Sequence, residues 1–408
     1  MNKIELLAPA GDFEKLKTAI YFGADAVYFA GKNYGLRAFG TNFADASLKD
    51  TVDYVHQHGK KAYVTLNVYA RDNDFEGLPA YINQLVEANV DAVIVSDLGV
   101  FNFVKKLAPN LAIHVSTQAN TTNKYAAKAY KDMGASRVVL ARELNLDEVS
   151  AIHKFVPDME LEAFVHGAMC ISYSGRCLLS NYLTGRDSNH GECVQACRWK
   201  YYVTEETRLG EQMEVSEDDR GTYIFNSKDM CLIEYLDKIA DSGVTSFKVE
   251  GRMKSPYYVA TVINAYRRAI DKLYACKKNG KPYKVDSNLL AELDKASHRS
   301  YTTGFMVSDG NIRQNLQTSH QDQNSKFIAM VLGVDSDKLL IEQRNKFSVG
   351  DKLEVLSPSL PLGHSIKVQA ITDEKGASVT EAKLVQQKLY ITCNTKGINA
   401  GDILRLSN

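Results

Sequence analysis

The chain has no long apolar run, and this absence excludes several classes of protein. Its first residues, MNKIELLAPAGD, pass from a short apolar segment directly into a turn, so no signal peptide is indicated. No later segment stays apolar for the roughly 20 residues that a membrane helix needs. We therefore expect a cytoplasmic protein with no membrane partner. Structural disulfides are rare in that compartment.

An excess of charge of either sign is also missing. The 408 residues include 49 Lys and Arg against 49 Asp and Glu. This balance neither predicts nor excludes a nucleic-acid partner, because a basic patch can form on a neutral protein. No H-E-x-x-H motif and no Ser-His-Asp order is visible, so a conventional protease mechanism has no support. No G-x-G-x-x-G follows the first expected strand, which disfavours a dinucleotide-binding sheet.

Cysteine is scarce but concentrated. Five of the seven cysteines lie in one stretch, namely Cys170, Cys177, Cys193, Cys197 and Cys231. In a reducing compartment such a cluster favours a metal or iron–sulfur centre, because thiolates are soft ligands. The alternative is a set of small buried residues. Structural zinc sites use tight C-x2–4-C pairs, and only Cys193 and Cys197 approach that spacing, so the spread favours an iron–sulfur cluster.

A pattern of helix, small residue and short apolar strand recurs through residues 1–250. Its copies are Gly23–Phe29, Asn89–Val95, Gly134–Leu140 and Gly243–Val249. The small residue suits a left-handed helix end, and the apolar run suits a strand buried on both faces. Strands are expected near residues 4, 26, 62, 92, 112, 137, 161 and 246, which predicts a TIM-like (β/α)₈ barrel, with a doubly wound sheet as the alternative. Expected helices include Asp12–Phe22, Leu48–His58, Gly77–Glu87 and Leu146–Phe155.

The sequence indicates three regions. Residues 1–275 form the barrel, with a cysteine-rich insert at about 167–243 after the seventh strand, and residues 276–322 form a helical connection. Residues 323–408 predict a small all-β domain, expected to close as a barrel. Its charge is only weakly basic, so packing or dimerisation is favoured slightly over RNA contact. Its strands are expected at Lys326–Leu332, Lys338–Ile341, Lys352–Leu356, Ile366–Ile371, Leu389–Thr392 and Ile403–Leu406.

The carboxyl ends of barrel strands are where such folds keep their chemistry. We assign catalysis to His166, Glu143 and Arg142, and substrate binding to Arg37, Arg142, Arg252, Lys248 and Gln118. Histidine suits acid–base work or ligation. Guanidinium groups bind carboxylates and phosphates through two parallel hydrogen bonds, so the three arginines predict an anionic ligand. The alternative is that they form a structural ring of ion pairs with Asp97, Glu143 and Glu250.

Several segments together carry a resemblance to a known family. They are EAFVHGAMCISYSGRCLLS at 162–180, NYLTGRDSNHGECVQACR at 181–198, NSKDMC at 226–231, KVEGRMK at 248–254 and LAPAG at 7–11. This set closely resembles the signature of peptidase family U32, the collagenase-like proteases. The resemblance covers essentially the whole chain, including a C-terminal β domain.

The resemblance implies an oxygen-independent hydroxylase with a four-iron–four-sulfur cluster. The branch most similar to this chain hydroxylates the wobble uridine of tRNA at carbon 5, with prephenate, a small carboxylate, as co-substrate. By resemblance the cluster ligands are Cys170, Cys177, Cys193 and Cys231, with Cys197 a fifth candidate. A second copy of the chain or a related family member is a further expected partner. The alternatives are a peptidase, as the family name states, and an RNA-binding or assembly factor without catalysis.

Overall fold

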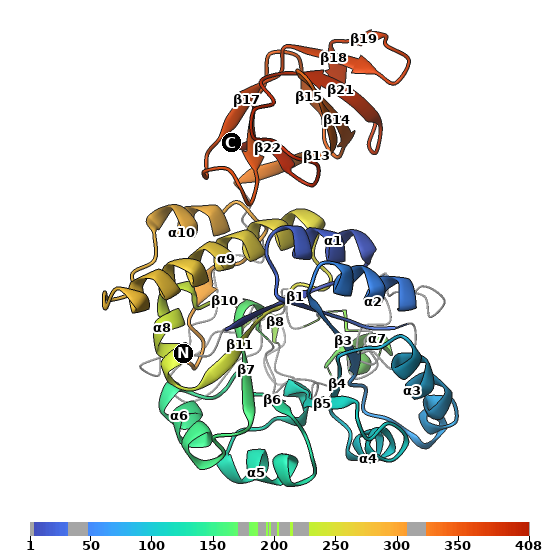
Figure 1. The fold of residues 1–408 in the computed structure, drawn as a ribbon, viewed down its shortest axis with the longest axis vertical. Helices are drawn as coiled ribbons and strands as arrows, with labels where there is room; N and C mark the ends of the chain where they lie inside the picture. Colours follow the sequence, from blue (N-terminus) through green and yellow to red (C-terminus); the bar gives the residue numbers. More distant parts are fainter. Residues whose placement is uncertain are drawn as a thin grey trace. The chain divides into compact units, whose positions relative to one another are not determined.

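The computed structural model describes residues 4–31, 48–169, 179–186, 193–194, 196, 202–203, 213–214, 228–307 and 324–407. Within these residues eight parallel strands form a closed barrel, because β11 pairs with both β1 and β7. This arrangement confirms the expected (β/α)₈ barrel (Figure 1). The strands are β1 (Glu5–Pro9), β2 (Ala26–Phe29), β3 (Lys61–Leu66), β4 (Ala92–Val95), β5 (Ala112–Val115), β6 (Arg137–Val139), β7 (Glu160–Ala168) and β11 (Val244–Val249).

Helices alternate with the strands and lie outside them (Figure 1). The four expected helices are confirmed to within one residue at each end. The small residues that open the four copies of the pattern, Gly23, Asn89, Gly134 and Gly243, have positive φ as predicted, from +59° at Asn89 to +104° at Gly23. No described helix is long and apolar enough to cross a bilayer. The helices are α1 (Phe13–Tyr21), α2 (Leu48–Gln57), α3 (Leu78–Glu87), α4 (Leu98–Leu107), α5 (Lys124–Asp132), α6 (Leu146–Phe155) and α8 (Leu236–Asp241).

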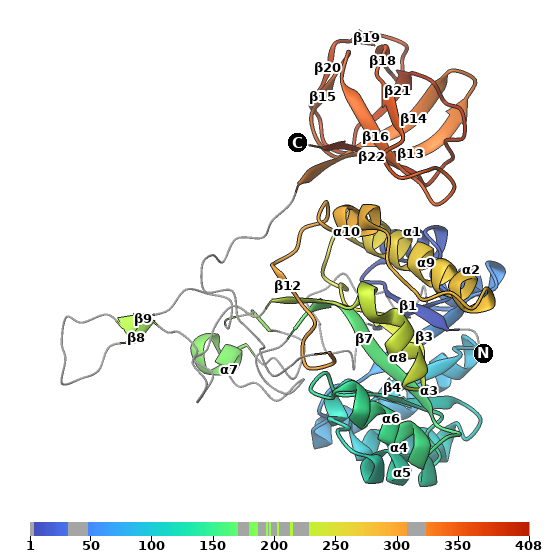
Figure 2. The same ribbon diagram turned by 90° about the vertical axis from the view of Figure 1, so that its left-hand side faces the viewer.

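The insert between β7 and β11 extends the barrel sheet. β7 is nine residues long, and beyond the barrel it pairs antiparallel with β10 (Asp229–Cys231). β10 in turn pairs with β12 (Tyr301–Thr302), which lies after the barrel in the sequence. Further described elements of the insert are α7 (Leu179–Thr184), β8 (Tyr202–Val203) and β9 (Met213–Glu214) (Figure 2).

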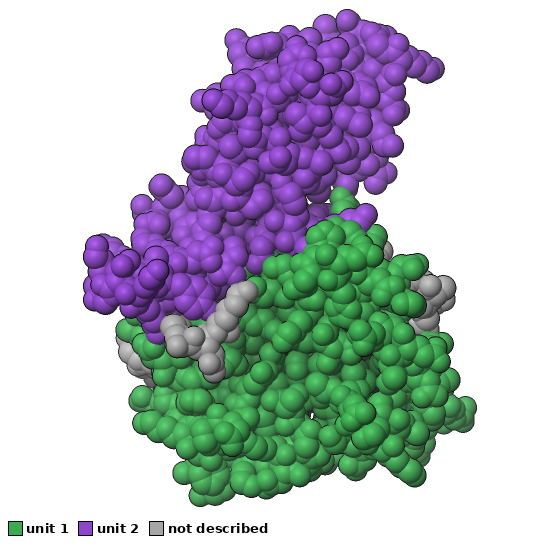
Figure 3. Space-filling view, viewed as in Figure 1, with its two compact units in different colours: residues 1–16, 24–254, 299–320 green, residues 17–23, 255–298, 321–408 purple. Residues whose placement is uncertain are grey.

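The chain divides into two compact units, and the second comprises residues 17–23, 255–298 and 321–408 (Figure 3). It contains the long helix α9 (Pro256–Lys278) and the short helix α10 (Ser287–Leu293). Ser255 caps α9 by accepting a hydrogen bond from the Tyr258 N–H, and Pro256 suits the first helical position. Of the expected helical connection at 276–322, the structure describes α10 and β12, while residues 308–322 lie outside the described part.

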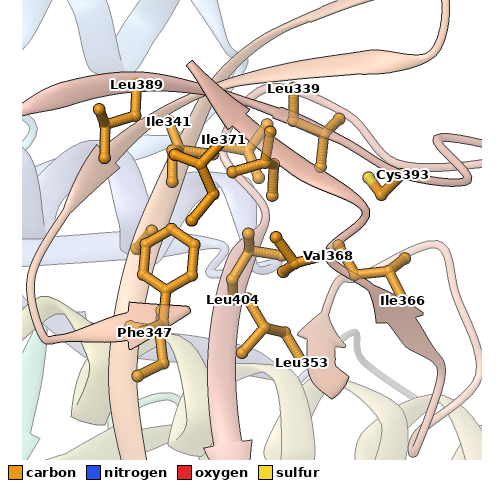
Figure 4. Close-up of a cluster of buried hydrophobic side chains, with 14 of the residues drawn as sticks. Leu339, Ile341, Phe347, Leu353, Ile366, Val368, Ile371, Leu389, Cys393 and Leu404 are labelled. Atoms are coloured by element: carbon orange, nitrogen blue, oxygen red, sulfur yellow. The ribbon is translucent and has the colours of Figure 1, made fainter. Parts of the chain in front are cut away.

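The C-terminal part of this unit is all-β, as predicted. One sheet has the order β17-β16-β22-β13-β14-β21-β18-β19, and a short pair joins β15 to β20. Buried side chains from strands along the whole sheet meet in one core, shown in Figure 4. The strands are β13 (Ser325–Asp335), β14 (Lys338–Gln343), β15 (Phe347–Ser348), β16 (Lys352–Leu356), β17 (Ser365–Lys367), β18 (Ala370–Asp373), β19 (Ser378–Val379), β20 (Glu381–Ala382), β21 (Lys388–Thr392) and β22 (Ile403–Ser407).

One expected strand is wrong, because Ile366–Ile371 forms two strands. β17 pairs with β16, whereas β18 pairs with β21. The switch occurs between two neighbouring amides: Val368 N–H donates to Asp351 O, and Gln369 N–H donates to Thr392 O. Alternating apolar residues continue through this switch, so the hydrophobic pattern alone does not reveal it.

Candidate active site

The barrel brings the predicted site residues to one end, because the carboxyl ends of its parallel strands meet there. We call this end the mouth. Arg37 lies outside the described residues, so its place is not assigned. The described residues are Gln118 in η3 (Thr117–Ala119) after β5, Arg142 and Glu143 after β6, His166 on β7, and Lys248 and Arg252 on or after β11. Their roles remain predictions.

A capping box fixes the loop that carries Arg142 and Glu143. The Asn145 side chain accepts from the Glu148 N–H at 3.0 Å, and the Glu148 carboxylate accepts from the Asn145 N–H at 2.9 Å. This reciprocal pair satisfies two amides at the start of α6 and sets where the helix begins. The loop is therefore short and defined at both ends.

The barrel interior below the mouth is charged, although TIM-like interiors are usually filled by branched apolar side chains. Arg137 Nη1 donates to Glu5 Oε1 at 2.6 Å and to Glu162 Oε2 at 3.0 Å. The other Glu162 oxygen, Oε1, accepts from Lys248 Nζ at 2.6 Å. Glu5 Oε2 accepts from the Tyr63 hydroxyl at 2.7 Å. We call Glu5, Arg137, Glu162 and Lys248 the interior ion network.

Burial sets the electrostatics of this network. The side chains of Arg137, Glu162 and Lys248 are 4%, 0% and 5% exposed. Burial lowers the pKa of Lys248, and the Glu162 carboxylate opposes that effect. Burial also acts to raise the pKa of Glu162, but Lys248 and Arg137 together hold it below its usual range. Burial places the pKa of His114 well below its ordinary value, so this neighbouring imidazole is neutral.

Two aromatic rings, Tyr28 and Phe164, lie against the Lys248 end of the interior ion network, and we call them the aromatic floor. Lys248 Nζ lies 4.4 Å from the Tyr28 ring centre and 5.5 Å from that of Phe164. Arg142 Cζ lies 3.9 Å from the Phe164 ring centre. These distances are typical of cation–π contacts. The Tyr28 hydroxyl lies 3.1 Å from Glu250 Oε2, which ties the floor to the mouth.

The arginine after β11 is tied to the end of β3. Arg252 is buried, and its Nη1 donates to Thr65 Oγ1 at 3.2 Å. Asp97, one of the acids considered for a structural ring, instead caps α4 by accepting from the Val100 N–H at 3.0 Å. Its carboxylate therefore serves a helix terminus.

Two side-chain oxygens next to the mouth are buried without a hydrogen-bond partner within the described residues. They are Gln118 Oε1 and Glu143 Oε2. Their loops lie side by side, because the Thr117 hydroxyl donates to Leu140 O at 3.1 Å. Burial raises the pKa of Glu143. Two buried acceptors of this kind suit a ligand that presents N–H or O–H groups.

Cys231 lies beside the mouth because β10 returns along β7. It is directly opposite His166 in the antiparallel pair, so both side chains project from the same face of the sheet. His166 is 1% exposed, with its ring centre 5.5 Å from that of Tyr301. Cys231 is half-buried and Cys193 is exposed, and both are thiols rather than halves of a disulfide.

The remaining cluster candidates Cys170, Cys177 and Cys197 lie outside the described residues. In the ranges that the structure does describe, no group of three or more His, Cys, Asp or Glu residues forms a metal site. The thiol of Cys231 at the catalytic end of the barrel fits a thiolate-ligated cluster in chemistry and in place.

Sequence reasoning missed two features of the site. The strand β10 has only three residues, which is too short for a periodic signal. The interior ion network had a usable signal. Glu5, Glu162 and Lys248 stand inside apolar strands, where alternate residues face one side, and Arg137 begins another such strand.

Comparison with known proteins identifies the family. The model of peptidase family U32 matches residues 11–316, and that of the U32 C-terminal domain matches residues 323–405. The chain is 38% identical to "tRNA hydroxylation protein P1" of Bacillus subtilis over 385 residues, covering 94% of this chain and 90% of that protein. It is 37% identical to "tRNA hydroxylation protein P" of Escherichia coli over 406 residues, covering 88% and 87%. It is 34% identical to "Collagenase" of Porphyromonas gingivalis over 282 residues, covering 66% of each. The chain belongs to peptidase family U32.

Proposed function

We propose that this chain is a tRNA-modifying enzyme that hydroxylates the wobble uridine at carbon 5, with prephenate as co-substrate. One observation carries the proposal: two tRNA hydroxylation proteins match the chain at 37% and 38% identity over most of their length and of its own. The mouth supports it, because cationic side chains there suit an anionic ligand.

We assign separate roles to the described residues of the mouth. Arg142 and Arg252 bind carboxylate or phosphate oxygens, and the aromatic floor supplies a flat apolar surface. Gln118 and Glu143 accept hydrogen bonds from donor groups of the substrate, which would satisfy their buried oxygens. Because burial raises its pKa, Glu143 is also a candidate to hold and transfer a proton. His166, buried opposite Cys231, is the second candidate for proton transfer.

We further propose that Cys170, Cys177, Cys193 and Cys231 hold a four-iron–four-sulfur cluster. Two of the four are described, and neither is locked in a disulfide. The pairing of Cys231 with His166 supports a cluster at the mouth rather than elsewhere in the insert. When bound, the cluster would supply electron transfer for the hydroxylation.

Complementation tests the proposed activity. We expect the chain to restore 5-hydroxyuridine derivatives in tRNA of an Escherichia coli strain that lacks its own tRNA hydroxylation proteins, measured by mass spectrometry of nucleosides. Arg142→Ala should reduce the restored level about tenfold to a hundredfold, because a hydrogen bond to a charged group is worth about 1.5–3 kcal/mol. Lys49→Ala, at a lysine 66% exposed on the outer helix α2, is the control.

A soluble, expressed chain that restores none of these nucleosides would contradict the proposal. Cleavage of gelatin by the purified chain, lost in His166→Ala, would favour a peptidase instead, in keeping with the relative named collagenase.

Cysteine variants test the cluster without relying on activity. We expect alanine at Cys170, Cys177, Cys193 or Cys231 to remove most bound iron and the thiolate-to-iron absorbance of the anaerobically purified chain. Cys276→Ala and Cys393→Ala are matched controls, because these two cysteines lie outside the cysteine-rich stretch. If Cys197→Ala loses the cluster and Cys193→Ala keeps it, the fourth ligand is Cys197.

A further inference from the structure

The interior ion network is ordered by depth. Strand pairing places Glu5, Glu162 and Ser246 at one level, because Glu5 pairs with Ser246 and Ser246 pairs with Glu162. Lys248 and Phe164 pair with each other one inward-facing step nearer the mouth. The anion of the Lys248–Glu162 pair therefore lies deep and the cation lies shallow. Such a pair directs its positive end toward the mouth.

The Glu162 carboxylate contacts groups deeper in the barrel as well as Lys248. Its Oε2 accepts from Arg137 Nη1 at 3.0 Å and lies 3.4 Å from the Ser246 hydroxyl, while Oε1 accepts from Lys248 at 2.6 Å. Arg137 is itself fixed by Glu5, and by Glu160, whose Oε2 accepts from Nε at 2.9 Å. These contacts on both oxygens fix the orientation of the Glu162 carboxylate.

Several other groups act on Lys248 from the surrounding strands. Glu162 favours its charged form most strongly, Glu250 adds to that effect, and Arg137 opposes it. Other titratable groups that the described residues place in the barrel interior include Glu5 on β1, Tyr28 on β2, Tyr63 on β3 and the neutral His114 on β5.

We propose that Glu162, anchored by Arg137, is a positioning residue that keeps Lys248 protonated and fixed against the aromatic floor, where its charge acts on a carboxylate-bearing substrate in the mouth. The inference rests on the proposed function for the identity of that substrate. Neither Glu162 nor Arg137 needs to touch the substrate to act in this way.

A purely structural role explains the network less well. Burying ion pairs costs desolvation energy that their attraction only partly repays, and well-packed apolar side chains are often as stabilising. Most TIM-like barrels fill this space with aliphatic residues. The ion network is therefore expected to stabilise the fold less than an apolar interior would, which favours a role for it in function at the mouth.

The charge state of Lys248 can be measured directly. Lysine labelled with 13C at Cε gives a resonance for Lys248, assigned by its absence in Lys248→Met, and its shift against pH gives the pKa. In Glu162→Gln we expect that pKa to fall by about 2 units or more, because a buried lysine without a counterion favours the neutral form. Glu160→Gln is the matched control: Glu160 also binds Arg137, but its side chain is 53% exposed.

The pH dependence of prephenate binding tests whether the charge of Lys248 acts on a ligand in the mouth. A protonated Lys248 favours anion binding, so affinity is lost as pH rises through its pKa. We expect calorimetry on the full chain to show that midpoint moving to lower pH in Glu162→Gln by the same amount as the NMR pKa. Glu162→Asp keeps a carboxylate and should recover part of the shift, and it also serves if Glu162→Gln folds poorly.

Two results would overturn the inference. One is a Lys248 pKa in folded Glu162→Gln that equals the wild-type value. The other is a shifted pKa with no matching change in prephenate binding. Failure of the tRNA complementation with the NMR shift intact would instead count against the proposed function alone.

Discussion

Replacing Arg405 with methionine destabilises the C-terminal unit by about 3–5 kcal/mol, the usual cost of removing one partner from a buried ion pair. Arg405 is fully buried, and its Nη1 and Nη2 donate to the two Glu292 oxygens at 2.6 and 2.7 Å. Nη2 also donates to Glu354 Oε1 at 2.6 Å. Methionine fills similar space but leaves the buried Glu292 carboxylate to Lys295, whose ammonium is 3.4 Å away on a partly exposed side chain.

The Arg405 contact joins α10 to the β sheet within one unit, so its loss should destabilise both the helix and the sheet. We expect faster hydrogen exchange at β16 and β22 and a lower urea midpoint for the C-terminal unit of the full chain. Lys383→Met is the matched control, because Lys383 pairs with Glu381 at the surface with a side chain 65% exposed. Exposed pairs of this kind contribute little to stability, because solvent screens them.

A double variant separates the ion pair from the packing around it. Arg405→Met with Glu292→Leu removes both charges, so much of the lost stability should return. If Arg405→Met alone costs no more than Lys383→Met, the buried contact contributes little and the explanation is wrong.

The barrel was predictable from sequence because its strands are buried on both faces and most of its helices are followed by a residue with positive φ. Runs such as Ala92–Val95 are continuous in apolar residues, and Asn89 or Gly134 marks the preceding helix end. These local signals repeat, and repetition identifies the fold class. The predicted mouth follows from the same pattern, since it depends only on where each strand ends.

Other parts of the site depend on partners far away in the sequence. Cys231 comes opposite His166 only because β10 turns back along β7, and no periodicity in the intervening insert requires that. Arg137 and Glu162 stand 25 residues apart and meet because β6 pairs with β7, whereas the Arg137–Glu5 contact joins β6 to β1 and needs the closed barrel. The switch at Val368 likewise needs β16 and β21 to be in place.

Replacing Gly167 with alanine should be among the most damaging single-methyl changes in the barrel, because Gly167 lies against the backbone of Glu250. Its φ is +109°, and an added Cβ would lie 2.5 Å from the Glu250 carbonyl oxygen. The neighbouring Glu250 N–H donates to His166 O at 2.8 Å, so β7 and β11 meet here. The clash can be relieved only by moving the backbone that carries His166 and Glu250.

Gly59→Ala separates this clash from backbone strain alone. Gly59 also has a positive φ, +66°, but nothing lies within 4 Å of an added Cβ. Gly59→Ala should therefore lower the free energy of unfolding by about 1–2 kcal/mol and leave the tRNA modification level unchanged. Gly167→Ala should cost more by urea denaturation and lower the modification level about a hundredfold, the typical effect of a shift of about 1 Å in catalytic groups. Equal losses in both variants would mean that strain alone explains Gly167, whereas a selective loss at Gly167 would show that the contact with Glu250 positions the catalytic end of β7.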